Sequence, residues 1–264
     1  MTYNAAIVDL DGTVYRGESL IPNAAEGIKT LREAGIQILF VTNKPIDRRE
    51  KYCDKLNDLG VNCNSDEIIT SATASADYLS QNHSEAEVYV VGETALVEEL
   101  HYAGVQTTTS PQRANVLIAS IDFDFDYQVL QDALTVLSEK DTIFVATNPD
   151  QTCPIDNGEI PDAAGMIGAI EGITGRELDQ LIGKPSNVIL QMALNRLDTD
   201  PERCLMIGDR LETDIKMGNQ AGMTTILPMT GVTSHEDLRQ GKVDVDHVVS
   251  DLSELAENIT LQSK

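Results

Sequence analysis

The sequence predicts an α/β protein in which a parallel sheet, with helices on its faces, is interrupted by a second α/β unit. Short apolar runs alternate with amphipathic stretches from the N-terminus, in the β-α-β-α order that builds parallel sheets. A second series of such runs begins near residue 80, and no low-complexity linker precedes it. The middle block is therefore predicted to be inserted into the first domain.

The first elements of the expected sheet lie before residue 80. Residues 5–9 (AAIVD) form a short apolar run that ends in acids and a glycine, which is typical of a buried parallel strand ending at a functional loop. A helical pattern begins at Pro22 and ends before Gly35. Three further elements are expected: a strand at 36–41, an amphipathic helix at 47–59 and a helix at 71–79.

The middle block contains three strand candidates, at 88–92, 116–121 and 142–146, with helical stretches near 94–103 and 127–138. Residues 147–164 are rich in Pro, Asp, Asn and Gly and are predicted to form a long functional loop. The last part is expected to contain helices at 186–196 and 211–221 and strands at 204–207, 224–227 and 248–249. We therefore predict a core of residues 1–78 and 179–264 and an inserted unit of residues 79–178.

The charge of the chain limits the classes of function. It has 19 Lys and Arg against 43 Asp and Glu, a formal net charge of -24, and the acids are spread along the chain. Binding of nucleic acid through a basic face is therefore disfavoured. The acids form either an ordinary solvated surface or an adaptation to high salt, and we favour the halophilic interpretation.

Other features of the chain indicate where the protein works. The four cysteines form no C-x-x-C pair, and no histidine stands near them at zinc-ligand spacing, so free thiols of a reducing compartment are expected. The N-terminus lacks the pattern of a signal peptide, and no apolar run has the length of a membrane span. We expect a soluble, cytoplasmic protein without membrane partners.

An acid pair follows the first predicted strand. Asp9 and Asp11 are separated by one residue, and Gly12 permits a turn. Alternate residues of an extended chain point to opposite faces, so one carboxylate can face a metal and a phosphorus atom while the other faces a leaving group. The alternative is an ordinary Asp-Gly turn.

Three further motifs fall at predicted strand ends, where open α/β sheets bind ligands. Thr42 and Asn43 can donate to phosphate oxygens or cap a helix. Lys184, before a helical segment, can pair with a phosphate or be a surface lysine. Asp209 and Asp214 can complete the oxygen-ligand site that Mg²⁺ prefers, or simply begin a helix.

Together, these motifs resemble those of the haloacid dehalogenase superfamily: DLDGT (9–13), VTNKP (41–45), GKPS (183–186) and GDRLETD (208–214). Matches at TSATA (70–74) and ATNPD (146–150) resemble the group of NagD, the p-nitrophenyl phosphatases and the phosphoglycolate and pyridoxal phosphatases. The resemblance covers nearly the whole chain. It implies a Rossmann-like parallel-sheet core with an inserted α/β cap that sets the substrate.

The resemblance also assigns roles to individual residues. It implies a Mg²⁺-dependent phosphomonoester hydrolase in which Asp9 is the nucleophile and forms an aspartyl-phosphate. Asp11 becomes the general acid and then the general base, in contact with the substrate. The phosphoryl oxygens are held by Thr42, Asn43 and Lys184. Mg²⁺ is bound by Asp9, the backbone carbonyl of Asp11 and Asp209, and Asp214 supports that acidic loop.

Two departures from the family pattern leave the small phosphorylated substrate open, whether sugar phosphate, nucleotide or phosphoglycolate. Lys44 and Pro45 stand where many relatives have Asn and Ser, and the cap loop at 160–164 lacks the usual glycines. Candidate cap contacts to the substrate, or else solvated turn residues, are Asp150, Asp156 and Asn157. The rival functions are a phosphotransferase on the same core and a non-catalytic binding module. The resemblance also suggests a homodimer formed through the cap.

Overall fold

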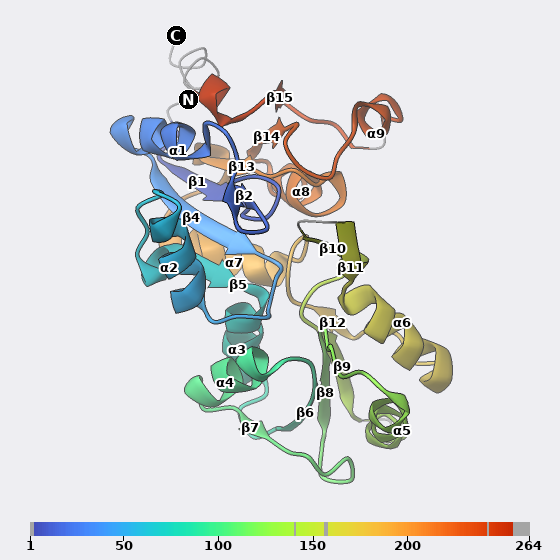
Figure 1. The fold of residues 1–264 in the computed structure, drawn as a ribbon. Coiled ribbons are helices and arrows are strands. Elements are labelled where there is room, and N and C mark those ends of the chain that lie inside the picture. The colour runs from blue at the N-terminus through green and yellow to red at the C-terminus, as the bar shows by residue number, and fades with distance from the viewer. Residues whose placement is uncertain (1–2, 140, 156–157, 242, 256–264) are drawn as a thin grey trace.

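The computed structural model describes residues 3–139, 141–155, 158–241 and 243–255 and contains two parallel sheets, one above the other in Figure 1. The first sheet has the strand order β15-β14-β13-β1-β4-β5. Its strands are β1 (Ala5–Val8), β4 (Gln37–Thr42), β5 (Ile68–Thr70), β13 (Cys204–Ile207), β14 (Thr224–Pro228) and β15 (His247–Val249). The α/β fold with a parallel sheet that the sequence predicts is confirmed.

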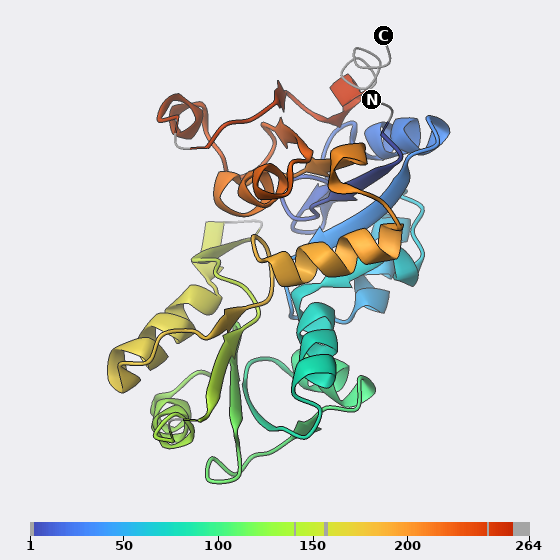
Figure 2. The ribbon, with the colours of Figure 1, turned by 180° about the vertical axis from the view of Figure 1, so that it is seen from behind.

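Helices cover both faces of the first sheet. On one face lie α1 (Ala24–Glu33) and α2 (Arg49–Asp58), and on the other lie α3 (Ser71–Asn82), α7 (Asn187–Leu197) and α8 (Lys216–Ala221). Figure 2 shows α7 in front of the sheet, on the side opposite to α1 and α2. Neighbouring strand residues divide between the two faces, so that Val8 and Phe40 pack in one core and Ile7 and Leu39 in the other.

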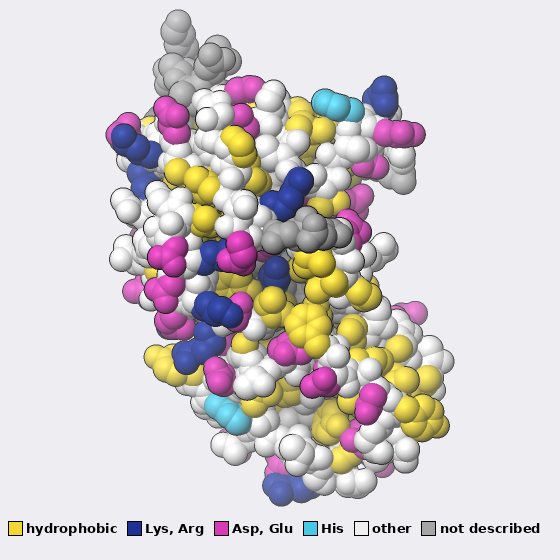
Figure 3. Space-filling model, viewed as in Figure 1, with side chains coloured by type: hydrophobic (Ala, Val, Ile, Leu, Met, Phe, Trp, Pro, Cys, Tyr) yellow, Lys and Arg dark blue, Asp and Glu magenta, His cyan; other side chains and the backbone are white. Residues whose placement is uncertain are grey.

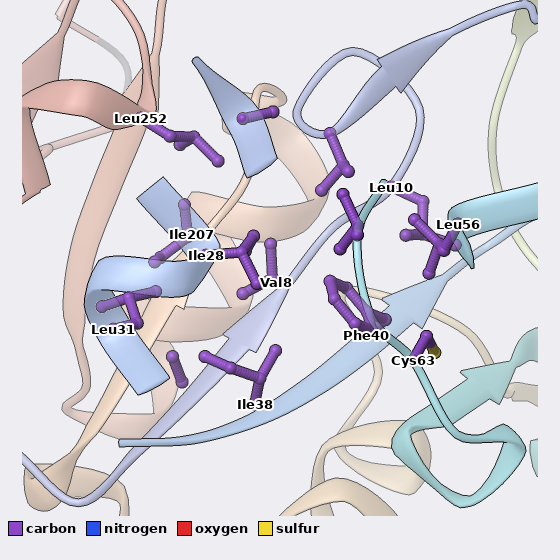
Figure 4. Packing of buried hydrophobic residues seen from close by; sticks show 14 of the residues in the cluster. Val8, Leu10, Ile28, Leu31, Ile38, Phe40, Leu56, Cys63, Ile207 and Leu252 are labelled. Carbon is purple, nitrogen blue, oxygen red and sulfur yellow. The ribbon is translucent and has the colours of Figure 1, made fainter. Parts of the chain in front are cut away.

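The core that includes the buried face of α1 is built mainly from aliphatic side chains, with Phe40, three tyrosines and two cysteines. Figure 4 shows Ile28 and Leu31 of α1 pointing toward Val8, Ile38 and Ile207 of the sheet. All of these side chains are buried. Because both faces of the sheet are covered, β1 and β13 are entirely apolar, and β4 has polar residues only at its two ends.

The second sheet has the order β12-β9-β8-β6-β7. It consists of β6 (Glu87–Val91), β7 (Gln106–Thr107), β8 (Val116–Ala119), β9 (Ile143–Ala146) and β12 (Gln180–Leu181). Its faces are covered by α3 with α4 (Thr94–Tyr102) and by α5 (Tyr127–Val136) with α6 (Ala163–Thr174). The domain bounds stay a prediction. The strand β12, two residues beyond the expected boundary at 178, pairs with β9 of this sheet.

The expected loop at 147–164 is the clearest difference from the sequence prediction. It contains an antiparallel pair, β10 (Thr152–Ile155) and β11 (Gly158–Pro161), and α6 begins before the loop was expected to end. Pro154 and Pro161 lie in these strands, which is possible because the ribbon has only two strands and some backbone N–H groups need no partner. The helix α6 was not predicted because three glycines interrupt its pattern.

Smaller elements also differ from the prediction. The expected helix at 211–221 begins as a π-helical turn, Leu211–Ile215, and continues as α8. Several short elements were not predicted: the strand pair β2 (Tyr15–Arg16) and β3 (Ser19–Leu20), the strands β5, β7 and β12, and α9 (His235–Arg239). Elements of two to five residues carry too little periodicity to be detected. Within the described ranges, no helix is both long and apolar enough to cross a membrane.

Candidate active site

The parallel register brings three loops together at the carboxyl edge of the first sheet. Val8 is aligned with Phe40 of β4 and with Ile207 of β13, so the residues after these strands meet at one place. Asp9 and Asp209 come directly from two of these strand ends. Gly12 has a φ of +86°, and a Cβ there would overlap the Asp209 side chain, so this turn needs glycine.

A buried acidic cluster lies at this edge. Carboxylate oxygens of Asp9, Asp209 and Asp214 lie within 4.8 Å of one another, and all three residues are buried. Lys184 comes from the loop before α7, and its Nζ pairs with Oδ1 of Asp9 and lies 2.7 Å from Oδ1 of Asp214. Lys184 is only 2% exposed, so it is not the surface lysine of the alternative interpretation.

The cluster carries more negative than positive charge. Burial raises the pKa of Asp9 well above its ordinary value, and burial together with Asp214 raises the pKa of Asp209 to about 6. Burial works to lower the pKa of Lys184, but attraction to Asp214 and Asp9 raises it on balance. Lys184 therefore stays protonated, and three carboxylates face one ammonium group.

The residues of the cluster fit a metal ion. Oδ1 of Asp209 is buried and has no hydrogen-bond partner among the described residues. Its Oδ2 accepts from the backbone N–H of Val232 at 2.5 Å, which fixes the orientation of the carboxylate. An all-oxygen donor set of buried carboxylates suits a hard divalent cation, which would also balance the excess negative charge. The group includes Asp214, which the sequence prediction makes a supporting residue only.

Asp11 lines the same pocket as Asp9 and Lys184. Its Oδ1 is 3.4 Å from Nζ of Lys44. Its Oδ2 is buried and has no hydrogen-bond partner within the described ranges. Burial works to lower the pKa of Lys44, but the Asp11 carboxylate raises it on balance. Asp11 therefore lines the pocket beside a charged lysine.

Thr42 and Asn43 hold the neighbouring loops. Oγ1 of Thr42 accepts from the backbone N–H of Lys44 at 3.1 Å, and the nearest helix, α2, begins only at Arg49, so the helix-cap alternative is wrong. Oδ1 of Asn43 accepts from the backbone N–H of Lys184 at 2.7 Å, and its Nδ2 donates to the Lys184 carbonyl at 3.0 Å. In this arrangement Asn43 positions the loop that carries Lys184. Contact of either residue with a phosphoryl group stays a prediction.

The middle unit reaches this site through Asp150. Its Oδ2 accepts from Nδ2 of Asn43 at 2.8 Å and from Nδ2 of Asn148 at 3.0 Å. Its Oδ1 lies 3.3 Å from Nη1 of Arg210, and the other guanidinium nitrogen donates to the Thr152 carbonyl at 3.1 Å. Asp150 thus links the two units by pairing with core residues. The other two candidate contacts, Asp156 and Asn157, lie outside the described residues.

The sequence prediction omits Arg210, although it lies inside the GDRLETD motif. The signal that could have found it is its charge: a lone basic residue between Asp209 and Asp214.

Asp162 caps α6, with Oδ1 accepting from the backbone N–H of Ala163 at 2.6 Å, and it also lines the site. Burial raises the pKa of Asp162 above its ordinary value.

These residues line a pocket between the two units. The first sheet contributes the acid pair, Thr42, Asn43 and Lys184, and the middle unit contributes Asp150, Asp162 and the strand β10. Among the described residues that line it, none is aromatic. In Figure 3, Lys and Arg side chains gather at mid-height, over the junction of the two units.

Two protein-family models match the chain. Haloacid dehalogenase-like hydrolase matches residues 6–106, and HAD-hydrolase-like matches residues 181–255. The sugar-phosphatase AraL of Bacillus subtilis (strain 168) is 36% identical over 252 residues, covering 95% of this chain and 92% of AraL.

Solved structures agree over the whole length. The p-nitrophenyl phosphatase from Archaeoglobus fulgidus has a TM-score of 0.91 and 32% sequence identity, covering 98% of this chain and 100% of that one. NagD from E. coli K-12 has a TM-score of 0.86 and 31% identity, covering 96% and 98%.

The chain therefore belongs to the haloacid dehalogenase-like hydrolases. Within them it falls in the group that includes NagD and the p-nitrophenyl phosphatases. The predictions of this fold, of this group and of a phosphatase are confirmed by the comparisons. The roles of the individual site residues stay predictions.

Proposed function

We propose that this hydrolase releases phosphate from a small phosphorylated metabolite, with Mg²⁺ as cofactor and an aspartyl-phosphate on Asp9 as intermediate. One observation carries the proposal. Asp9 lies in a buried cluster with Lys184 and Asp209, and Asp11 lines the same pocket as Asp9 and Lys184. A nucleophile, a phosphate-binding cation, metal ligands and an acid are thereby provided at one pocket.

Carboxylates of Asp9 and Asp209 and the backbone carbonyl of Asp11 would hold Mg²⁺. When bound, the ion supplies positive charge that draws the phosphate dianion into an acidic site and stabilises the charge of the transferring group. Lys184 supplies the second positive charge, and Asp214 keeps that ammonium in place.

The reaction takes two displacements at phosphorus. In the first, a carboxylate oxygen of Asp9 bonds to phosphorus while the bond from phosphorus to the ester oxygen breaks, and Asp11 gives its proton to that oxygen. In the second, Asp11 takes a proton from water, the water oxygen bonds to phosphorus, and the bond to Asp9 breaks. Phosphate leaves, and both aspartates return to their starting states.

The pocket favours a compact polar substrate. No aromatic side chain lines its described part, so it offers no surface on which a nucleobase could stack. Thr152 and Asp162 lie on the side of the middle unit and can bind hydroxyl groups. A sugar phosphate is consistent with this lining and with the name of the relative AraL.

The direct test is the Asp9→Asn variant. We expect Mg²⁺-dependent phosphate release from p-nitrophenyl phosphate to fall by at least about 10³-fold, as for other enzymes that lose their nucleophile. In the unmodified enzyme, acid quenching during turnover should trap a phosphorylated protein, which the variant cannot form. Asp54→Asn changes an exposed acid of α2 and serves as the matched control. Normal turnover by Asp9→Asn would contradict the proposal.

Two further proposals concern the setting of the enzyme. The four cysteines are free and buried, which is consistent with a cytoplasmic protein.

Phe123 and Tyr127, near the start of α5, are 58% and 82% exposed and could form part of a homodimer surface on the middle unit. Sedimentation of the Phe123→Ser, Tyr127→Ser double variant as a monomer, beside a dimeric parent, would support that contact. A monomeric parent would contradict it.

A further inference from the structure

Lys44 is a pocket cation that the proposed reaction does not use. It follows Asn43 in the loop after β4, and its side chain is 20% exposed. It lines the pocket together with Cys153 and Pro154 of the strand β10. Its Nζ lies 3.4 Å from Oδ1 of Asp11, which is its nearest carboxylate.

The other two cations of the pocket each have two partners at short range. Lys184 pairs with two buried carboxylates, those of Asp9 and Asp214. Arg210 pairs with Asp150 and donates to a backbone carbonyl of β10. Lys44 has one carboxylate, at a long distance, and an ammonium group has three N–H donors. It is therefore the pocket cation, among the described residues, with the most capacity to bind another anion.

The position of Lys44 indicates which part of a substrate it would meet. In the proposed reaction the ester oxygen lies about 3 Å from Asp11, since Asp11 gives it a proton. Nζ of Lys44 lies 3.4 Å from Oδ1 of Asp11, and neither residue belongs to the acidic cluster of Asp9, Asp209 and Asp214. An anionic group on the carbon that bears the ester oxygen would therefore come within reach of Lys44.

The remaining acids of the pocket do not prevent this pairing. The carboxylate of Asp150 is paired with Arg210, and Oδ1 of Asp162 accepts from Nδ2 of Asn148 at 3.1 Å. Both belong to the middle unit, whereas Lys44 and Asp11 belong to the loops of the first sheet. Among the described pocket residues, Lys44 is therefore the cation that a second anion could reach, beside the acid that serves the leaving group in the proposed reaction.

We propose that Lys44 is a specificity-determining residue, which pairs with a second anionic group, a carboxylate, on the carbon next to the ester oxygen. The inference rests on the proposed function, because it places the ester oxygen at Asp11. It names a substrate class: phosphomonoesters of 2-hydroxy acids.

Two esters test this inference, because they differ only in one group. 2-Phosphoglycolate carries a carboxylate where 2-hydroxyethyl phosphate carries a hydroxymethyl group. We expect the parent enzyme to have a kcat/KM about 10- to 100-fold higher for the carboxylate, the range for a hydrogen bond between charged groups. The Lys44→Met variant should bring this ratio close to one, and Lys44→Arg should keep the preference.

Lys51→Met is the matched control. Lys51 lies on α2, its side chain is 72% exposed, and its Nζ pairs with Asp47 at 2.6 Å. This variant removes the same charge outside the pocket and should leave the ratio unchanged.

Each other outcome has a definite meaning. If Lys44→Met lowers kcat/KM for both esters equally, Lys44 serves only Asp11, and the inference is wrong. It is also wrong if the parent enzyme shows no preference, or hydrolyses p-nitrophenyl phosphate but neither of the two esters. If the parent hydrolyses none of the three, the proposed function itself fails.

Discussion

At the scale of single residues, Lys184 shows how burial changes the meaning of a motif. In the sequence it is one lysine before a helix, for which a surface position is the common case. In the structure it is enclosed, and its charge persists because two carboxylates face it. Removing one partner of a buried ion pair leaves the other charges uncompensated, so this residue supports stability as well as phosphate binding.

We therefore predict that Lys184→Met lowers the free energy of unfolding of the metal-free protein by about 3–5 kcal/mol, because it leaves Asp9 and Asp214 buried without a counterion. Urea unfolding in the presence of a chelator measures this effect. Lys51→Met removes an exposed lysine of the same length and should change the stability by less than about 0.5 kcal/mol. Equal stabilities of the two variants would disprove the pairing.

The raised pKa values of the acidic cluster predict how the stability of the metal-free protein depends on pH. The pKa of Asp209 is about 6 in the folded state, above its ordinary value of 3.8, and that of Asp9 is raised too. Between these values the folded state binds more protons than the unfolded state, so stability falls as pH rises from about 4 to 6. For Asp209 alone the loss is about 3 kcal/mol.

Thermal unfolding between pH 4.5 and pH 7.5, at constant salt and with a chelator, tests this prediction. The Asp209→Asn variant should lose a smaller part of its stability over this range, which separates the effect of Asp209 from that of the net charge. Saturating Mg²⁺ should stabilise the parent more at pH 7.5 than at pH 4.5. A parent and variant with the same pH dependence would contradict the raised pKa of Asp209.

At the scale of elements, the strand ends and the ribbon β10–β11 determine the shape of the site. Parallel register aligns the ends of β1, β4 and β13, and the loops that follow carry the acids, the hydroxyl and the amide. The middle unit approaches them with Asp150, just before β10. The site therefore depends on a contact between segments more than 100 residues apart in the sequence.

We predict that Asp150 is coupled energetically to Arg210 across the two units. Asp150→Ala should lower the free energy of unfolding by about 1–3 kcal/mol, since it leaves Asn43 and Arg210 without their buried acceptor. A double-mutant cycle with Arg210→Ala should give a coupling of at least about 0.5 kcal/mol. Strictly additive losses would show that the two side chains do not interact in solution.

At the scale of the whole molecule, the net charge of -24 is the dominant property. Acidic side chains are distributed over the visible face in Figure 3, on both units. Their mutual repulsion opposes the compact state and is screened by salt, over about 10 Å at 0.1 M and about 3 Å at 1 M. This supports the proposal that the protein is adapted to high salt.

We predict that raising KCl from 0.1 M to 2 M increases the melting temperature and the turnover of p-nitrophenyl phosphate at saturating Mg²⁺. Screening of the surface acids is the cause, so Na⁺ and K⁺ should act alike at equal ionic strength. A protein that is fully active in dilute buffer and gains no stability in molar salt would contradict the halophilic proposal.

The sequence alone was sufficient for the fold class, the order of the main elements and the candidate catalytic residues. These features depend on local signals: apolar runs of strand length, and acids or glycines where the runs end. Asp9, Asp11, Lys184 and Asp209 stand at predicted strand ends, but each motif is ambiguous alone, and their roles were predicted from the resemblance to the haloacid dehalogenase superfamily. The short strands β5 and β12, the proline-containing ribbon and the glycine-rich α6 give weak local signals, so only their pairing and packing reveal them.

The tertiary structure decided how these residues are paired and how deeply they are buried. That Lys184 is enclosed between Asp9 and Asp214, that Asn43 and Arg210 hold Asp150, and that Lys44 keeps a free bonding capacity all depend on contacts between distant segments. Local periodicity reports which way a side chain faces within its own element. Burial and charge pairing depend on which other elements cover that side chain, and packing of the two units determines this.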